Sequence, residues 1–398
     1  MERTLSCKST CDPQNPARIV FSYLAEGGAN VVFSFIKPSF NDVFPWFCFV
    51  DSTDGNDTLW DEKSNPVVLK GVVGYPDIMG KVLRVSKGVD KTLRCDEIVS
   101  GFCNDIQPLF VRGSIRTIVS DSTNGLSETA LTLPDVDLRN HLMEHERVML
   151  SDGTVQDLMA KCDRICEKNP DGSLSRDPRW GILLPDLTPE PDMAILIELK
   201  PKWLSQSPSS PPNAVRCRTC AMQVAKPKDA AKYLCPLRLV SGEGDDIYPW
   251  ILDRVNEKLA KGLSRARTRA PKYASLIVEY LTQGDGKALL QHLEFLQTHL
   301  DPQGITRRPK ENPNATFDRN LRLAMTLRDC SLFLTVTYNG GLEDFGPVTV
   351  TSVLGDLDFK SADKIDDWLS KEKELESINA YTKKVEGNLG CVLNKTKG

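Results

Sequence analysis

Two aspartates flank a predicted β-hairpin late in the chain, where they could act on one reacting group. Residues 331–337 and 348–354 indicate two strands, and Asn339-Gly340-Gly341 between them is typical of a turn. Asp329 comes just before the first strand and Asp356 just after the second, so antiparallel pairing would bring their carboxylates together. A phosphotransferase needs such a pair, one to accept the proton of an attacking hydroxyl and one to hold magnesium. The alternative is structural, because aspartates commonly begin turns and end strands.

A charged motif follows another predicted strand. The apolar run at 194–197 indicates a buried strand, and it continues directly into Glu198-Leu199-Lys200-Pro201-Lys202-Trp203. Proline fixes its own backbone and favours an extended conformation at Lys200. In an extended chain Lys200 and Lys202 project to the same side, which suits a ligand with several phosphates. The alternative is an edge strand that carries a solvated pair of lysines.

Further cations surround these two motifs in the sequence. Arg218 and Lys226 follow the lysine motif, and Lys360 and Lys364 follow Asp356. Such clusters in a protein with a net charge of −4 are most often solvated faces. Here they flank the candidate aspartates on both sides, which favours a local pocket for a polyphosphate.

A glycine-containing turn near the start of the chain could contact a nucleotide. Strand-like alternation on either side of residues 25–30 predicts a hairpin with Gly27 and Gly28 at its tip. Glycines there would let backbone amides approach phosphate oxygens closely, although an ordinary surface hairpin explains them equally well. Arg84, on a predicted strand at 80–85, could pair with a nucleotide phosphate or simply lie on the surface of a sheet. Sequence motifs of standard protein kinases and of P-loop enzymes are absent.

The spacing of Cys217 and Cys220 is that of half a zinc site. A structural zinc ion needs two more ligands, and no second pair with suitable spacing follows in the sequence. His292 and His299 fall on a leucine-rich segment, where surface or packing roles are the simpler interpretation. We therefore expect no structural zinc.

The composition limits the classes of function. Hydrophobic residues make up 40% and charged residues 26% of 398 positions, which is ordinary for a soluble globular protein. The slightly negative net charge argues against a general binder of nucleic acid or of membrane surfaces. No signal peptide is apparent, the apolar runs are too short to span a bilayer, and the twelve cysteines are expected to be reduced thiols.

The pattern changes along the chain from strand-like to helix-like. We expect a β-rich N-lobe over residues 1–138 and a mixed α/β C-lobe over 139–398, giving an α+β fold. Apolar residues recur at helical spacing over 247–259 and 289–300, which predicts two helices. The Ser/Pro-rich residues 205–213 lack any periodicity and predict a mobile linker.

Taken together, these motifs resemble those of the inositol-pentakisphosphate 2-kinase family, in particular its fungal branch. Each motif is weak alone, but six occur in the order of the family and extend over most of the chain. The matching blocks are Glu26-Gly27-Gly28-Ala29-Asn30, Gly80-Lys81-Val82-Leu83-Arg84, Glu198-Leu199-Lys200-Pro201-Lys202, Arg218 through Lys226, Arg328-Asp329-Cys330-Ser331 and Asp356-Leu357-Asp358-Phe359-Lys360.

The resemblance implies a two-lobed inositol-phosphate kinase fold distantly similar to protein kinases. It also implies ATP-dependent phosphorylation of inositol 1,3,4,5,6-pentakisphosphate at the 2-hydroxyl, giving inositol hexakisphosphate (phytate). Asp329 would be the catalytic base and Asp356 the magnesium ligand. The remaining residues would contact ATP, namely Glu26, Gly27, Gly28, Ala29, Asn30 and Arg84, or the inositol phosphate, namely Lys200, Lys202, Arg218, Lys226, Lys360 and Lys364.

Two positions depart from the family pattern. Met222 stands where members often carry a histidine, and Trp368 stands at the place of an aromatic residue with a hydroxyl. The alternative function is an inositol-phosphate-binding scaffold with a weakened kinase centre, against which the presence of both aspartates argues. We further expect a monomer in the nucleus, the cytoplasm or both, with no nucleic-acid or membrane partner.

Overall fold

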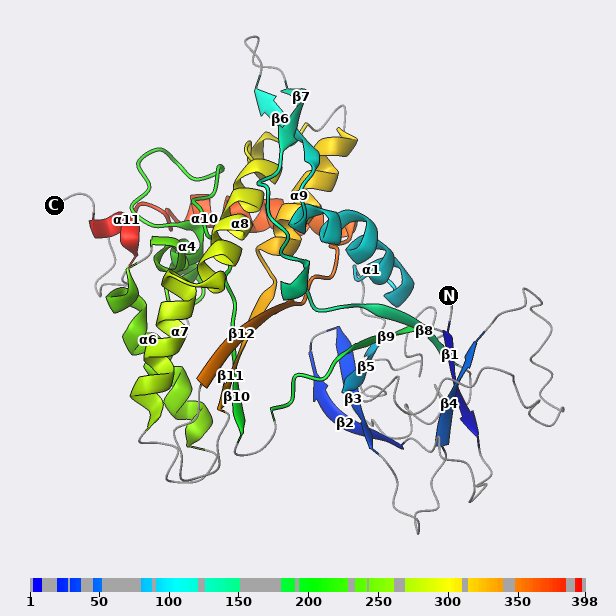
Figure 1. The fold of residues 1–398 in the computed structure, drawn as a ribbon. Coiled ribbons are helices and arrows are strands. Elements are labelled where there is room, and N and C mark those ends of the chain that lie inside the picture. Colours follow the sequence, from blue (N-terminus) through cyan, green and yellow to red (C-terminus); the bar gives the residue numbers. More distant parts are fainter. Residues whose placement is uncertain are drawn as a thin grey trace. The chain divides into compact units, whose positions relative to one another are not determined.

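The computed structural model of the chain is drawn in Figure 1. Its contacts separate two compact units, one made of Met1–Gly101 and Met143–Leu187 and the other of Phe102–Leu142 and Thr188–Gly398. The structure describes residues 3–8, 20–27, 29–36, 46–51, 80–87, 91–120, 126–150, 180–189, 193–227, 233–241, 243–260, 269–309, 314–338, 348–383 and 391–395.

The first unit is built on a sheet with the strand order β2-β3-β5-β9-β8-β1-β4. All neighbours pair antiparallel except β1 and β8, which are parallel. Val31, Phe33 and Leu83 are fully buried in its core, and helix α1 (Cys95–Gly101) packs against β8 and β9. The strands are β1 (Arg3–Lys8), β2 (Val20–Glu26), β3 (Asn30–Ile36), β4 (Trp46–Asp51), β5 (Lys81–Ser86), β8 (Glu146–Leu150) and β9 (Trp180–Pro185).

The second unit contains an antiparallel sheet of order β10-β11-β12 and a two-stranded ribbon, β6 and β7. Strand β11 lies at the centre of the three-stranded sheet, and its inward residues Leu332, Leu334 and Val336 are fully buried. The strands are β6 (Ser114–Ser120), β7 (Leu126–Thr132), β10 (Ala194–Leu199), β11 (Ser331–Tyr338) and β12 (Val348–Gly355). The predicted late hairpin is confirmed, while its turn lies outside the described residues.

Helices cover this sheet because each turns an apolar stripe toward it or toward a neighbouring helix. Helices α6, α7 and α8 lie side by side next to the sheet, and α9 packs on α8 (Figure 1). The stripes predicted over 247–259 and 289–300 are buried on α6 and α8, which confirms both helices. The helices of this unit are α4 (Arg218–Ala225), α5 (Leu237–Ser241), α6 (Gly244–Leu259), α7 (Ala270–Thr282), α8 (Asp285–Leu300), α9 (Ala315–Leu327), α10 (Ile365–Ser377) and α11 (Val392–Lys395), with short helical turns at Phe102–Ile106, Gln107–Phe110, Arg139–His141, Ile305–Arg307 and Ala362–Lys364.

The architecture is a mixed α+β fold with mainly antiparallel sheets. The contacts divide the chain differently from the single boundary expected after residue 138. Residues 102–142 follow α1 and belong to the second unit, whereas residues 143–187 belong to the first unit and contribute β8 and β9 to its sheet. None of the helices in the described part of the chain is long and apolar enough to cross a membrane.

The expectation of a mobile linker at 205–213 is wrong. Ser207 is buried, its backbone amide donates to the side chain of Gln206, and its carbonyl accepts from Ser210. The segment therefore satisfies its polar groups locally and packs onto the second unit, although its composition is that of a linker.

Candidate functional site

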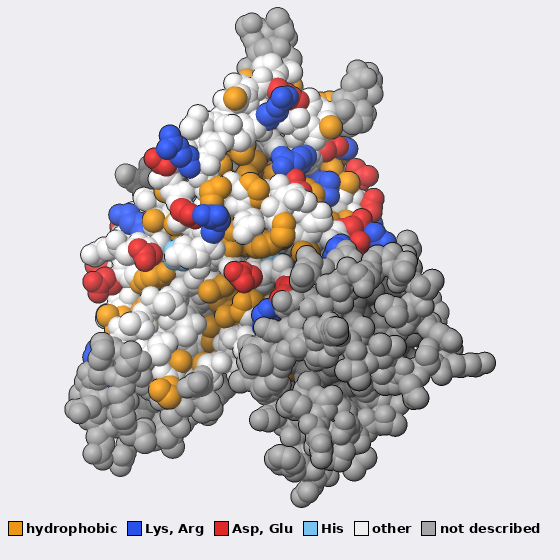
Figure 2. Space-filling view, turned by 45° about the vertical axis from the view of Figure 1, so that its right-hand side comes forward, with side chains coloured by type: hydrophobic (Ala, Val, Ile, Leu, Met, Phe, Trp, Pro, Cys, Tyr) orange, Lys and Arg blue, Asp and Glu red, His pale blue; other side chains and the backbone are white. Residues whose placement is uncertain are grey.

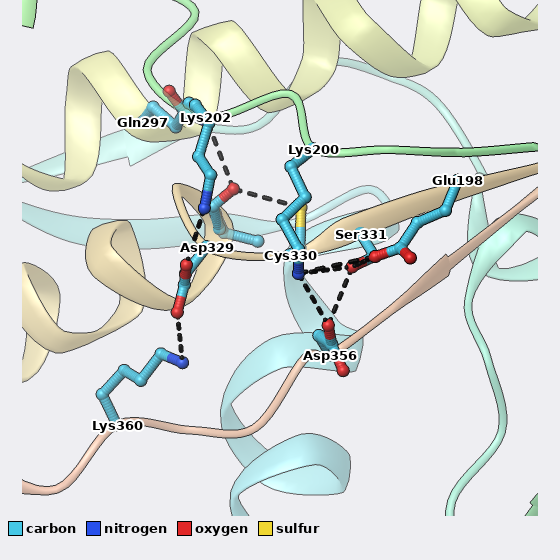
Figure 3. Close-up of polar contacts among 10 residues, drawn as sticks. Glu198, Lys200, Lys202, Gln297, Asp329, Cys330, Ser331, Asp356 and Lys360 are labelled. Carbon is cyan, nitrogen blue, oxygen red and sulfur yellow. Dashed lines mark hydrogen bonds and ion pairs between the residues drawn. The ribbon is translucent and has the colours of Figure 1, made fainter. Parts of the chain in front are cut away.

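Three strand ends meet at one edge of the three-stranded sheet. The end of β10 lies beside the start of β11, with Leu199 opposite Leu332, and the end of β12 lies on the other side, with Ser331 opposite Gly355. Antiparallel pairing therefore brings Lys200, Asp329 and Asp356 to the same edge. Figure 3 shows these side chains gathered there, together with those of Lys202 and Lys360. The juxtaposition that the sequence predicted is confirmed.

Asp329 lies between two ammonium groups. Its Oδ1 is 2.9 Å from Lys202 Nζ, and its Oδ2 is 3.0 Å from Lys360 Nζ (Figure 3). Burial alone would raise the pKa of Asp329, but the charges of Lys360 and Lys202 outweigh it and lower the pKa to about 2. The carboxylate is therefore ionised at neutral pH, while its side chain remains 54% exposed to solvent and to ligands.

This ion pairing predicts an acid-dependent contribution of Asp329 to stability. The pKa is about 2 in the folded chain against an ordinary value of 3.8, so the folded state binds this proton more weakly than the unfolded state. The stabilisation is complete above the unfolded pKa and is lost as the pH falls through the folded value. The difference in stability between wild type and Asp329→Asn should therefore shrink between about pH 5 and pH 2. Denaturant unfolding over that range measures it, and a difference independent of pH would contradict the assignment.

A second charged group lies beside the first. Lys200 Nζ is 3.0 Å from Asp356 Oδ2 and 2.8 Å from Ser331 Oγ, and it lies 3.6 Å from Glu198 Oε1. Ser331 Oγ lies within hydrogen-bonding distance of both carboxylates, at 2.7 Å from Glu198 and 2.8 Å from Asp356, and its single proton is donated to one of them at a time. Burial would lower the pKa of Lys200, but the carboxylates, Asp356 first, raise it, so the ammonium group stays charged.

Two residues of the site have a backbone conformation that side chains other than glycine rarely adopt. Lys202 and Asp356 have φ values of 56° and 54°. Such left-handed residues persist where the surrounding structure holds them, and they cluster at functional sites. At Lys202 part of that support is visible, because the buried side chain of Gln297 donates to the Lys202 carbonyl at 2.9 Å. The turn directs the Lys202 ammonium group toward Asp329.

Below this turn lies a stack of buried charged and aromatic groups. The ring of Trp203 is covered by the guanidinium groups of Arg328, at 3.6 Å from the ring centroid, and Arg218, at 4.5 Å. Arg328 forms a buried ion pair with Asp301 at 2.6 Å, and Arg218 pairs with Glu372 at 2.8 Å. These contacts fix Trp203, which directly follows Lys202. The buried stack therefore holds Lys202 in position, although its own side chains are not exposed at the site.

The other three predicted substrate contacts, Lys364, Arg218 and Lys226, lie in different surroundings. Burial, and then the positive charge of the nearby Lys360, lower the pKa of Lys364. Arg218 is buried against Glu372, and Lys226 is exposed at the end of α4. The structure thus brings together the predicted lysines at 200, 202, 360 and 364. The role of all six basic residues as substrate contacts stays a prediction.

The predicted nucleotide contacts belong to the first unit. The antiparallel pairing of β2 and β3 confirms the early hairpin, with Gly27 exposed in its turn and the Gly27 amide donating to the Asn30 carbonyl at 2.9 Å. Gly28 lies outside the described residues, and the side chain of Glu26 is not described. Ala29 accepts from the Lys87 amide at 2.8 Å. Arg84 is buried on β5, opposite Val32 of β3.

Several residues that the sequence reasoning passed over belong to these groups. Lys87 is almost fully buried and donates from Nζ to the Gly27 carbonyl at 2.7 Å, so it ties the glycine turn to β5. Glu198 and Ser331 border Asp356. Their signal was present in the sequence, because Glu198 is two residues from Lys200 in extended chain and Ser331 begins a strand of the hairpin.

Figure 2 draws one face of the molecule with its side chains coloured by type. On the face drawn in Figure 2, basic and acidic side chains of the described residues are interspersed, with apolar side chains between them. At the edge of the three-stranded sheet, by contrast, Lys200, Lys202 and Lys360 pair with the carboxylates of Asp329 and Asp356. Such a grouping has the chemistry to bind a small, multiply charged anion beside an ionised carboxylate.

Comparison with known proteins identifies the class of protein that carries such a site. The sequence model of the inositol-pentakisphosphate 2-kinase family matches residues 23–374, and the chain belongs to this family. An inositol-pentakisphosphate 2-kinase of Yarrowia lipolytica is 30% identical over 195 residues, covering 47% of this chain and 54% of that protein. An inositol-pentakisphosphate 2-kinase of Debaryomyces hansenii is 28% identical over 204 residues, which cover 46% of this chain and 50% of that protein. The chain thus spans about half the length of these relatives.

Proposed function

We propose that this protein is a magnesium- and ATP-dependent kinase that phosphorylates the 2-hydroxyl of inositol 1,3,4,5,6-pentakisphosphate. The observation that carries the proposal is the position of Asp329, an ionised carboxylate held between Lys202 and Lys360 beside a second group around Asp356. A substrate with five phosphates surrounding one free hydroxyl suits a base that is ringed by cations. Membership of the family supports the same substrate and reaction.

Asp329 would act as the base once the substrate is bound. Both of its carboxylate oxygens are paired with lysines in the structure. Substrate phosphates would compete for Lys202 and Lys360, because phosphate oxygens are strong acceptors for ammonium groups. Loss of these pairs would raise the pKa of Asp329 toward its ordinary value and free an oxygen for the attacking hydroxyl. Catalysis would then rest on positioning and charge neutralisation.

The residues around Asp356 fit a magnesium ion. Mg²⁺ prefers oxygen ligands, and the carboxylates of Asp356 and Glu198 each lie within hydrogen-bonding distance of the Ser331 hydroxyl. Asp356 would be the ligand, with Glu198 and Ser331 orienting it. When bound, the ion would neutralise charge on the nucleotide phosphates. Lys200, which balances the two carboxylates in the structure, would turn to a phosphate oxygen.

In this proposal the first unit serves as the nucleotide lobe of a fold distantly similar to protein kinases. The buried Lys87 holds the glycine turn in place by donating to the carbonyl groups of Gly27 and Ala29. Backbone amides at such a turn suit phosphate oxygens. Arg84 would supply a charge to the nucleotide from the neighbouring strand β5.

A transfer assay tests the proposal directly. The purified chain is incubated with ATP, Mg²⁺ and inositol 1,3,4,5,6-pentakisphosphate, and the position of the new phosphate is resolved by NMR. We expect inositol hexakisphosphate, formed only when both ATP and Mg²⁺ are present. Tight binding of the pentakisphosphate without any transfer would instead favour a scaffold with a weakened kinase centre.

A further inference from the structure

Four cysteine thiols gather in the interior of the second unit. Cys217, Cys220, Cys235 and Cys391 are all buried, and their Sγ atoms all lie within 4.8 Å of one another. The expectation that Cys217 and Cys220 have no further ligand partners is therefore wrong. The two missing thiols come from separate segments, one just before α5 and one just before α11, so no local spacing reveals them.

The distances between the sulfur atoms are those of a metal site. Cys217 Sγ is 3.9 Å from Cys235 Sγ, and Cys235 Sγ is 4.0 Å from Cys391 Sγ. A disulfide would bring two sulfurs to about 2.05 Å, so these thiols are not paired covalently. Tetrahedral zinc with sulfur ligands at about 2.3 Å places the sulfurs about 3.8 Å apart. The two sulfur–sulfur distances given above are close to this spacing, and all four sulfurs lie within 4.8 Å of one another.

Groups around the thiols are arranged as a metal's outer ligand shell. The backbone amide of Cys217 points at Cys391 Sγ at 3.3 Å, and the Tyr233 hydroxyl lies 2.8 Å from Cys220 Sγ. Such donors offset the negative charge that thiolates bring to a zinc site. Apolar side chains, including Leu237 and Val392, pack around the cluster and exclude water.

A purely hydrophobic role explains this arrangement less well. Buried cysteines pack readily in cores, as Cys330 does, where burial raises the pKa of a single isolated thiol to about 12. Packing alone does not require four sulfurs in mutual contact.

We propose that Cys217, Cys220, Cys235 and Cys391 bind one structural Zn²⁺ ion. Four sulfur ligands leave no open coordination position, so the ion would have no part in the chemistry of phosphate transfer. Binding would release the thiol protons and join three segments that are distant in sequence. One of these is the start of α4, where Arg218 covers Trp203 beside Lys202. By holding the start of α4, the ion would fix Arg218 over Trp203 and so stabilise the position of the neighbouring Lys202.

Metal analysis of the full chain, purified without a histidine tag, tests the proposal. We expect about one zinc per chain in the wild type, retained through mild dialysis against a chelator. Cys235→Ser and Cys391→Ser should each bind less than a tenth of that amount. Cys103→Ser alters an exposed cysteine outside the cluster and should keep the full stoichiometry. Zinc well below one per chain in the wild type, or full retention in both cluster variants, would overturn the assignment.

A measurement on the wild type alone separates the site from misfolding of the variants. X-ray absorption of the zinc-loaded protein should show four sulfur neighbours at about 2.3 Å, and replacement by Co²⁺ should give the charge-transfer absorption of a tetrathiolate. Zinc should also protect four thiols from alkylation. A coordination shell of nitrogen and oxygen, or mass-spectrometric detection of a disulfide among these cysteines in protein as purified, would refute the site even if every variant failed to fold.

Discussion

Replacing Asp329 with asparagine is expected to lower turnover by about 10²- to 10⁴-fold, the range typical of a lost general base. Asparagine keeps the size of the side chain but cannot accept the proton of the substrate hydroxyl. Lys202 and Lys360, the lysines proposed to hold the substrate phosphates, remain in place and lose only their partner. Affinity for ATP and for inositol pentakisphosphate should therefore change little. Steady-state kinetics together with calorimetry of each ligand separate the two quantities.

Lys360→Ala provides the matched contrast at the other end of the same ion pair. Lys360 would contact substrate phosphates in the ground state, so its removal should mainly raise KM and weaken the calorimetric affinity. Asp356→Asn should instead impair the magnesium-dependent binding of ATP. Near-normal turnover in Asp329→Asn would exclude this residue as the base, and the mechanism proposed above would be wrong.

The core of this site was predictable because strand pairing converts sequence order into proximity. A hairpin carries the residues at its two outer ends to one edge, so Asp329 and Asp356 had to meet once β11 and β12 paired. The prediction needed only the apolar strands and a turn-forming segment between them. The addition of β10 beside β11 then brought Lys200 to the same edge.

Other features depend on side-chain packing, which no local pattern contains. Arg218 belongs to a basic stretch of sequence, yet a buried carboxylate, Glu372, pairs with it inside the second unit. Trp368 fills an apolar cluster with Ile365 and Phe317, so it serves the core at this position. Met222 likewise packs against the cluster around Ala221. For both departures from the family pattern the structure shows apolar packing.

The division of the chain was also beyond local reasoning. The expected boundary after residue 138 placed all later residues in the C-lobe, whereas β8 and β9 lie in the middle of the seven-stranded sheet of the first unit. Strand β9 pairs with both β5 and β8, and its Ile182 and Leu183 are buried. Long-range pairing of this kind is decided by the whole sheet and not by the propensity of the segment.

Replacing Arg328 with methionine is expected to destabilise the fold by about 3–5 kcal/mol, the usual result of leaving one partner of a buried ion pair uncompensated. The side chains of Arg328 and Asp301 are only 1% and 2% exposed and lie 2.6 Å apart. Methionine has a similar length but leaves the Asp301 carboxylate without its charge partner. The change should appear as a lower midpoint of chemical denaturation for the second unit.

An exposed ion pair on α9, the helix that ends just before Arg328, supplies the control for this substitution. Arg319 pairs with Asp105 at 2.7 Å, but its side chain is 47% exposed, so Arg319→Met should cost at most about 1 kcal/mol. The double variant Asp301→Leu with Arg328→Met removes both buried charges and should recover much of the loss. Because Arg328 also covers Trp203, the single variant should weaken substrate binding through Lys202 even under conditions where it is folded. Equal effects of Arg328→Met and Arg319→Met would show that the buried pair does not support the site in this way.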